Sequence, residues 1–123
     1  MNRLLLAVLL GLSLASPSYA HDPRPGPNGG LKVDAGARHH AELVVNGSPQ
    51  VQVFLFDEND QPVPSQGYSA NAILLVGGAT QRFALQPGDG NSLVGTAPVS
   101  VPAGTKGAVQ ITGPDGATAQ ARF

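Results

Sequence analysis

The sequence predicts an all-β protein, an antiparallel immunoglobulin-like β-sandwich of about seven strands preceded by a signal peptide. Short segments in which apolar and polar residues alternate recur along the chain at intervals of roughly ten residues. Clusters of Gly, Pro, Asn and Asp separate these segments, and no window shows the 3.6-residue period of a helix.

Residues 1–20 have the features of a secretory signal peptide. A basic residue, Arg3, precedes the apolar run Leu4–Leu14, and the segment ends in the small residues Ser18-Tyr19-Ala20. The apolar run is shorter than the roughly 20 residues that a membrane-spanning helix needs. We therefore expect cleavage after Ala20, a periplasmic protein and no membrane span once the signal has been removed.

A lead-in segment, residues 21–30, follows the predicted cleavage site. It contains Pro23–Gly30 (PRPGPNGG), a composition that argues against a helix or a paired strand. We expect an extended, then turning, chain that leads to a first short strand at Leu31–Val33. Residues 31–123 then form the single β-sandwich domain, which is of a normal length for one domain.

The predicted strands after Leu31–Val33 are defined by alternation and by the turns between them. Arg38–Val45 (RHHAELVV) precedes a turn at Asn46–Pro49, where Asn-Gly between apolar runs favours a hairpin with the next strand. The residues between Asp60 and Tyr68 are expected to be a loop or edge segment, because they include Pro62 and Pro64. The remaining predicted strands are Gln50–Phe56, Ser69–Val76, Ala79–Leu85, Ser92–Val101 with a kink near Pro98, Ala108–Thr112 and Ala117–Phe123.

The composition limits the chemistry of the chain. It contains no cysteine, which excludes disulfides, and its one methionine is Met1, which leaves with the signal peptide. Soft ligands for monovalent copper are therefore absent from the mature chain, whereas imidazole, carboxylate and amine groups favour divalent copper, zinc or nickel. Acidic residues slightly outnumber basic ones and no basic patch is visible, so we do not expect nucleic acid as a partner.

The strongest candidate site lies in the strand Arg38–Val45. Successive side chains of a strand point to opposite faces, so His40 and Glu42 are expected to share the outward face while Ala41 and Leu43 face the core. An imidazole and a carboxylate side by side can bind one cation. The alternative is a solvated His40–Glu42 pair. His39 points the other way and can join the same ion only if the strand bulges; otherwise it is half-buried and structural.

His21 is a second candidate ligand, because cleavage after Ala20 makes it the new amino terminus. A terminal histidine offers its α-amine and its imidazole to divalent copper, and Asp22 can add an oxygen. Pro23 lacks an N–H, which excludes a square-planar site built from successive deprotonated amides. The alternative is that cleavage follows the ordinary preference for small residues and that His21 has no role.

The acidic segment Asp57–Asp60 is a further candidate. A calcium loop requires a glycine at its sixth position, which is Pro62 when the count starts at Asp57. We therefore expect a solvated acidic turn.

Several segments resemble a known family. Gly26-Pro27-Asn28-Gly29-Gly30, followed by His40-x-Glu42-Leu43, is similar to the motif of small periplasmic domains of heavy-metal efflux systems. Those domains occur alone or at the N-terminus of the membrane fusion (adaptor) subunits. The segments Leu85–Leu93 and Ala121–Phe123 fit the same pattern. The resemblance implies a periplasmic, metal-associated β-sandwich in which His40 and Glu42 occupy matching polar positions, and an efflux-system component as partner. A second likeness, to small copper-resistance β-sandwich proteins, rests on chain length, the absence of cysteine and His21.

No enzyme motif is present. The chain has neither a Gly-x-Ser-x-Gly elbow nor a phosphate-binding Gly-x-x-x-x-Gly-Lys loop, so we expect no enzyme. The favoured hypothesis is a periplasmic divalent-metal (Cu, Zn or Ni) binding or efflux-accessory protein, with a Cu or Zn ion as cofactor. The alternative is a metal-free immunoglobulin-like envelope interaction module with structural histidines. A copper-dependent oxidative enzyme ranks third.

Overall fold

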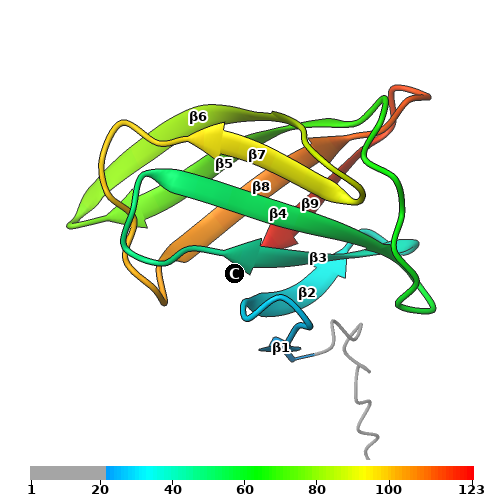
Figure 1. The fold of residues 1–123 in the computed structure, drawn as a ribbon, viewed down its shortest axis with the longest axis horizontal. Helices are drawn as coiled ribbons and strands as arrows, with labels where there is room; N and C mark the ends of the chain where they lie inside the picture. The colour runs from blue at the N-terminus through cyan, green and yellow to red at the C-terminus, as the bar shows by residue number, and fades with distance from the viewer. Residues whose placement is uncertain (1–21) are drawn as a thin grey trace, which may run out of the picture.

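The computed structural model describes residues 22–123, which contain nine β-strands (Figure 1). The predicted signal peptide and His21 lie outside the described residues. No helix of the described part is long and apolar enough to cross a membrane. The strands are β1 (Arg24–Pro25), β2 (Leu31–Ala35), β3 (His39–Val44), β4 (Gln50–Asp57), β5 (Ser69–Val76), β6 (Ala79–Pro87), β7 (Ser92–Thr96), β8 (Lys106–Thr112) and β9 (Thr118–Arg122).

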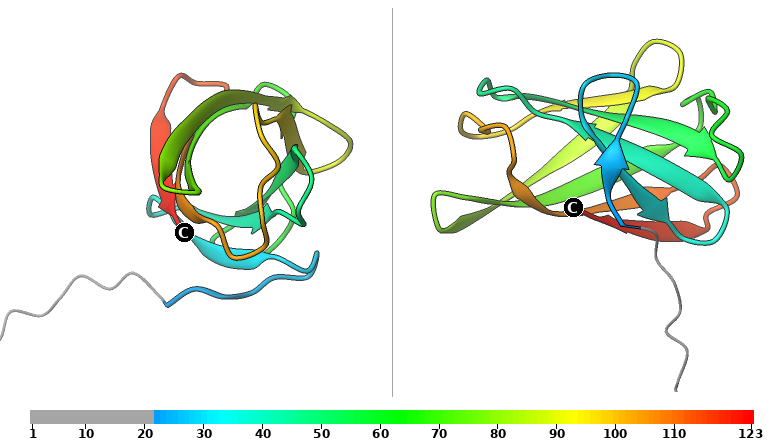
Figure 2. Two further views of the ribbon diagram at one scale, coloured as in Figure 1. Left: turned by 90° about the vertical axis from the view of Figure 1, so that its left-hand side faces the viewer. Right: turned by 90° about the horizontal axis from the view of Figure 1, so that it is seen from below.

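Eight of these strands form a closed antiparallel barrel. They are hydrogen-bonded in the order β2-β3-β4-β7-β6-β5-β8-β9, and the pairing of Ala35 with Ala121 joins β9 back to β2. The closed ring is visible when the molecule is viewed along the barrel (Figure 2). The additional strand β1 lies outside the ring and pairs with the beginning of β2 through Arg24 and Lys32.

The predicted immunoglobulin-like sandwich is therefore wrong, although the all-β prediction is confirmed. A sandwich consists of two sheets with free edges, whereas here the last strand pairs with the first strand of the ring. The strands β5, β6 and β7 follow one another through hairpins, and β8 then returns to lie beside β5, which is a Greek-key arrangement. Alternation locates the strands but carries no information on which distant strands pair.

The interior of the barrel is filled by alternate residues of the strands. Eight strands enclose a space just wide enough for side chains to fill it. Small alanine side chains and larger leucine and valine side chains from several strands fill the interior together. The fully buried apolar residues include Ala35, Ala41, Val51, Val53, Leu55, Ala72, Leu74, Leu85, Leu93, Val101, Val109 and Ala121.

Most strands lie where alternation predicts them. The strand Ser69–Val76 has the predicted bounds, and β3 occupies all but the ends of the predicted Arg38–Val45 segment. The strand predicted at Ser92–Val101 ends at Thr96 instead. The lead-in was expected to contain no paired strand, and this expectation is wrong, since β1 pairs with β2. A proline is compatible with β1 because this short strand lies at an edge, where its missing N–H breaks no ladder.

The contact between β6 and β7 depends on a glycine. Only Gln86–Val94 and Pro87–Leu93 pair in register across these two strands. A Cβ at Gly95 would overlap the carbonyl oxygen of Ala84 and lie 2.7 Å from Cδ2 of Leu85. The backbone of β7 can approach β6 this closely because residue 95 has no side chain.

We predict that Gly95→Ala lowers the free energy of unfolding by about 1–3 kcal/mol, because the added methyl group must push two strands apart in a packed wall. Urea denaturation measures the change. The control is Gly78→Ala in the β5–β6 turn. A Cβ at Gly78 would have no atom within 4 Å apart from its chain neighbours, so only the positive φ of +83° opposes the substitution. An effect of Gly95→Ala no larger than that of Gly78→Ala contradicts the role of Gly95 in strand approach.

Candidate functional site

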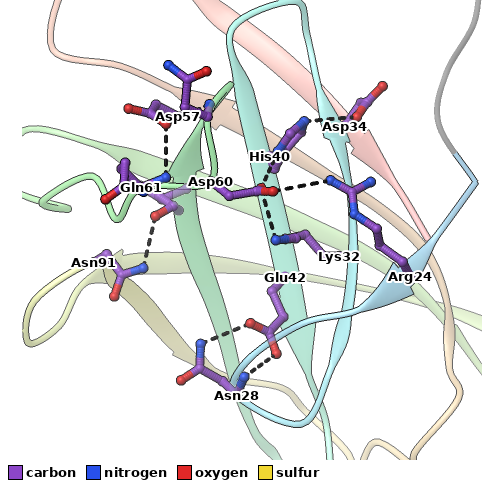
Figure 3. Close-up of polar contacts among 12 residues, drawn as sticks. Arg24, Asn28, Lys32, Asp34, His40, Glu42, Asp57, Asp60, Gln61 and Asn91 are labelled. Atoms are coloured by element: carbon purple, nitrogen blue, oxygen red, sulfur yellow. Dashed lines mark hydrogen bonds and ion pairs between the residues drawn. The ribbon is translucent and has the colours of Figure 1, made fainter.

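Four charged or polar side chains of β2 and β3 share the outer face of the barrel. In the β2–β3 register, Lys32 lies opposite Glu42 and Asp34 lies opposite His40. Their neighbours Val33 and Ala41 point into the core. The predicted sharing of one face by His40 and Glu42 is thus confirmed by the register. The alternative of a solvated His40–Glu42 pair is not found, because Lys32, His40 and Glu42 are all buried. The lead-in and the β4–β5 connection cover them (Figure 3).

Glu42 is enclosed by the lead-in segment Gly26–Gly30, here called the glycine loop. Its Oε2 accepts hydrogen bonds from the backbone N–H groups of Asn28 and Gly30, both at 2.8 Å. Its Oε1 accepts a hydrogen bond from Nδ2 of Asn28 at 2.9 Å. A Cβ at Gly26 would overlap the carboxyl carbon of Glu42. Both carboxylate oxygens therefore interact with the chain itself, and the side chain has no exposed surface.

His40 lies between two carboxylates. Its Nδ1 is 2.7 Å from Oδ1 of Asp60, and its Nε2 is 3.3 Å from Oδ1 of Asp34. The imidazole is about 10% exposed, whereas the Asp34 side chain is 23% exposed. Each ring nitrogen of His40 therefore faces a carboxylate, and the contact with Asp60 is the shorter of the two.

Asp60 reaches this face from the turn that follows β4. Oδ1 of Asp57 accepts hydrogen bonds from the N–H groups of Asn59 and Gln61 at 2.8 and 2.9 Å, and the N–H of Asp60 donates to the carbonyl oxygen of Asp57. Asp60 itself has a φ of 63°, a left-handed conformation that aspartate tolerates better than most residues. The turn therefore projects the Asp60 carboxylate toward β2 and β3.

Two cations also contact Asp60. Nζ of Lys32 is 2.9 Å from its Oδ1 and Nη2 of Arg24 is 3.7 Å from its Oδ2. The ammonium group of Lys32 also lies over the ring of Phe56, at 4.9 Å from its centroid. The hydrogen bond from Lys32, followed by that from His40, lowers the pKa of Asp60 from 3.8 to about 2. The acidic turn expected at Asp57–Asp60 is exposed at Asp60, whose side chain is 43% exposed. Its carboxylate nevertheless pairs with Lys32, Arg24 and His40, which the sequence did not predict.

His39 belongs to a different part of the molecule. Its Nε2 lies 3.3 Å from the hydroxyl of Tyr68, and the two rings meet edge to face with centroids 6.0 Å apart. His39 lines a cavity at the end of the barrel rather than the outer face. The two adjacent histidines are therefore separated by the strand alternation, as the sequence predicts, and His21 lies outside the described residues.

The described residues include no group of three or more His, Cys, Asp or Glu side chains that could hold one metal ion. Within residues 22–123, Nε2 of His40 and Oδ1 of Asp34 nevertheless form a pair at a short separation. We refer to Asp34, His40 and Asp60, together with Lys32 and Arg24, as the outer-face cluster.

The contacts of His40 with Asp34 and Asp60 were not predicted from the sequence. Lys32 and Asp34 carry a detectable signal, because LKVDA alternates and a hairpin around Gly36 sets these residues opposite Glu42 and His40. Asp60 belongs to the acidic segment Asp57–Asp60, but its approach to His40 depends on the conformation of the turn after β4, which the sequence does not indicate.

The described chain therefore belongs to the class of small closed antiparallel β-barrels, with a partly buried polar cluster on one outer face. Comparisons with protein-family models, with curated proteins and with solved structures found no match to the chain.

We predict that Glu42→Gln lowers the free energy of unfolding by about 1–3 kcal/mol. The amide NH2 cannot accept a hydrogen bond, so at least one donor of the glycine loop loses its partner in a buried site. Urea denaturation measures the loss, and faster hydrogen exchange at the Gly30 N–H locates it. Glu58→Gln, at an exposed position of the acidic turn, is the control and should change stability by less than about 0.5 kcal/mol. Equal effects of the two substitutions contradict the structural role of Glu42.

We predict that Asp60 makes the stability of the protein sensitive to acid. Its pKa in the folded state is about 2, below the ordinary value of 3.8, so its ionised form favours folding. This contribution is complete above about pH 4 and is lost as the pH falls toward 2. When unfolding is measured between pH 2 and 6, the free energy of unfolding should fall less with decreasing pH in Asp60→Asn than in the wild type. Parallel pH profiles contradict this assignment.

Proposed function

We propose that the protein binds a divalent metal ion, Cu²⁺ or Zn²⁺, through Nε2 of His40 and the carboxylate of Asp34. The observation that carries this proposal is the 3.3 Å separation of Nε2 and Oδ1. Nitrogen and oxygen ligands that each lie about 2.0–2.1 Å from a tetrahedral zinc ion are roughly 3.3 Å apart. The two atoms thus already have the spacing of neighbouring ligands.

Asp60 supports this role of His40. Metal-binding histidines commonly donate their second ring N–H to a carboxylate, which fixes the orientation of the ring and raises its basicity. Oδ1 of Asp60, 2.7 Å from Nδ1 of His40, is positioned for this interaction. The charge of Asp60 is balanced by Lys32 and Arg24, as suits a supporting group rather than a ligand.

His21 completes the site in this proposal. Strand β1, which begins three residues after His21, pairs with β2 through Arg24 and Lys32. Cleavage after Ala20 would give His21 a free α-amine beside its imidazole. Imidazole, carboxylate and amine ligands suit divalent copper, zinc or nickel. Glu42 and His39 have no part in the site, since the glycine loop binds Glu42 and His39 contacts Tyr68.

The proposal includes a role as an efflux accessory in the periplasm. What supports this role is the predicted signal peptide at residues 1–20 and the resemblance of the glycine loop and the His40-x-Glu42 segment to domains of heavy-metal efflux systems. An efflux-system component is then the expected partner.

We predict that the mature chain, with His21 confirmed as its first residue by mass spectrometry, binds one equivalent of Cu²⁺ or Zn²⁺ in competition with a chelator. His40→Gln and Asp34→Asn should each weaken binding at least tenfold, and Asp60→Asn by about tenfold, through the loss of ligands or of their support. His39→Gln is the matched control, since the adjacent histidine faces the barrel end, and it should leave the affinity unchanged.

Two results would contradict the proposed site. Unchanged affinity in His40→Gln excludes the outer-face cluster, and if binding then disappears in a chain that begins at Asp22, the terminal residue alone binds the metal. Absence of one-equivalent binding in the wild type leaves the histidines with structural roles, as in a metal-free interaction module.

A further inference from the structure

The end of the barrel opposite the glycine loop contains a cavity of about 530 Å³, here called the mouth cavity. It lies where the β2–β3 turn (residues 36–38), the β8–β9 turn (residues 113–117) and Tyr68 meet. Its apolar lining includes Leu55, Ile111 and Ala35, which are buried core residues. The cavity therefore reaches from the surface to the packed interior of the barrel.

The size of the mouth cavity is that of a ligand site. Sites for small molecules commonly have volumes of roughly 300–1,000 Å³ and apolar walls with a few polar groups. A second cavity, lined by Gly30, Leu43, Lys106 and Phe123 among others, lies at the other end and measures about 260 Å³. Only the larger of these two cavities falls within the usual range.

The polar side chains in the lining of the mouth cavity are those of Arg38, His39, Tyr68, Asp115 and Thr118. Arg38 belongs to the β2–β3 turn and is exposed, and His39 and Tyr68 form a hydrogen-bonded pair in the lining. Asp115 is the one acidic residue of the lining, and its Oδ1 accepts a hydrogen bond from the N–H of Ala117 at 3.0 Å. This bond holds the Asp115 side chain within its own turn. The guanidinium of Arg38 remains the strongest group for pairing with a charged ligand, because it can bind a carboxylate through two parallel hydrogen bonds.

We propose that the mouth cavity binds a small organic monocarboxylate with a cyclic or branched apolar body. The carboxylate pairs with Arg38 at the opening, and the apolar body packs against Leu55 and Ile111. This site is independent of the proposed metal site, since His39 and His40 point to opposite sides of β3 and only His39 lines the cavity. Binding of the carboxylate therefore does not require a metal ion.

Tyr68 provides a direct readout of binding. The chain contains two tyrosines, Tyr19 and Tyr68, and no tryptophan, so a chain that begins at His21 has one tyrosine and it lines the cavity. The probe is cyclohexanecarboxylate, which does not absorb where tyrosine is excited. Cyclohexanemethanol and cyclohexanemethylamine have similar apolar bodies and replace the negative charge by a neutral or a positive group.

We predict that cyclohexanecarboxylate changes the Tyr68 fluorescence saturably and binds at least tenfold more tightly than the amine. Arg38→Gln should weaken binding of the carboxylate at least tenfold and remove its advantage over the amine. Lys106→Gln, which removes a positive charge at the smaller cavity, is the matched control and should have no effect. Ala119→Phe places a large side chain in the lining and should prevent binding of all three probes. The amide NMR signals of residues away from the cavity should keep their wild-type positions.

Three results overturn the proposal. The first is no saturable binding of cyclohexanecarboxylate in the wild type, and the second is equal binding of the carboxylate and the amine. The third is an affinity that Arg38→Gln leaves unchanged. Metal titration of the same variants keeps the two sites distinguishable, because Arg38→Gln should leave metal affinity as in the wild type.

Discussion

The outer face of this barrel depends on one buried carboxylate. Glu42 has no exposed surface, and an ionised carboxylate in such a place is costly unless donors surround it. The glycine loop supplies three donors, two of them backbone N–H groups. Once the loop has closed on Glu42, β1 lies beside β2, and Arg24 comes within reach of Asp60. The lead-in is therefore an integral part of the folded domain rather than a linker to it.

Strand positions follow from the sequence, whereas the closure of the barrel does not. Alternation and turn residues locate β5 at its observed bounds and place His40 and Glu42 on one face. The ring, however, is closed by Ala35 and Ala121, two small residues with no feature that marks them as partners across most of the chain. An open sandwich and a closed barrel present the same alternation along each strand, so the predicted sandwich was wrong for a reason that local patterns do not reveal.

The candidate site shows the same division between local and long-range information. The glycine loop and Glu42, which the resemblance to efflux domains singled out as two separate segments, prove to be the two halves of one contact. This pairing accounts physically for their joint presence in the sequence. One partner of His40, in contrast, is Asp60, which lies in the turn after β4. Asp60 itself has a left-handed backbone conformation, and no glycine in the sequence indicates that conformation. Strand alternation directs His39 to the mouth cavity and His40 to the outer-face cluster, so the two adjacent histidines contact different parts of the molecule.

The claim that His40 is a metal ligand supported by Asp60 is tested most directly at the ring nitrogens of that residue. Two-dimensional nitrogen NMR of the mature chain, labelled in its histidines, distinguishes Nδ1 from Nε2 of His40 during titration with Zn²⁺. The account predicts that Nε2 shifts to the position of a metal-bound nitrogen while Nδ1 keeps its proton and its hydrogen bond to Asp60. Unchanged His40 resonances at one equivalent of zinc, or coordination through Nδ1, would contradict it.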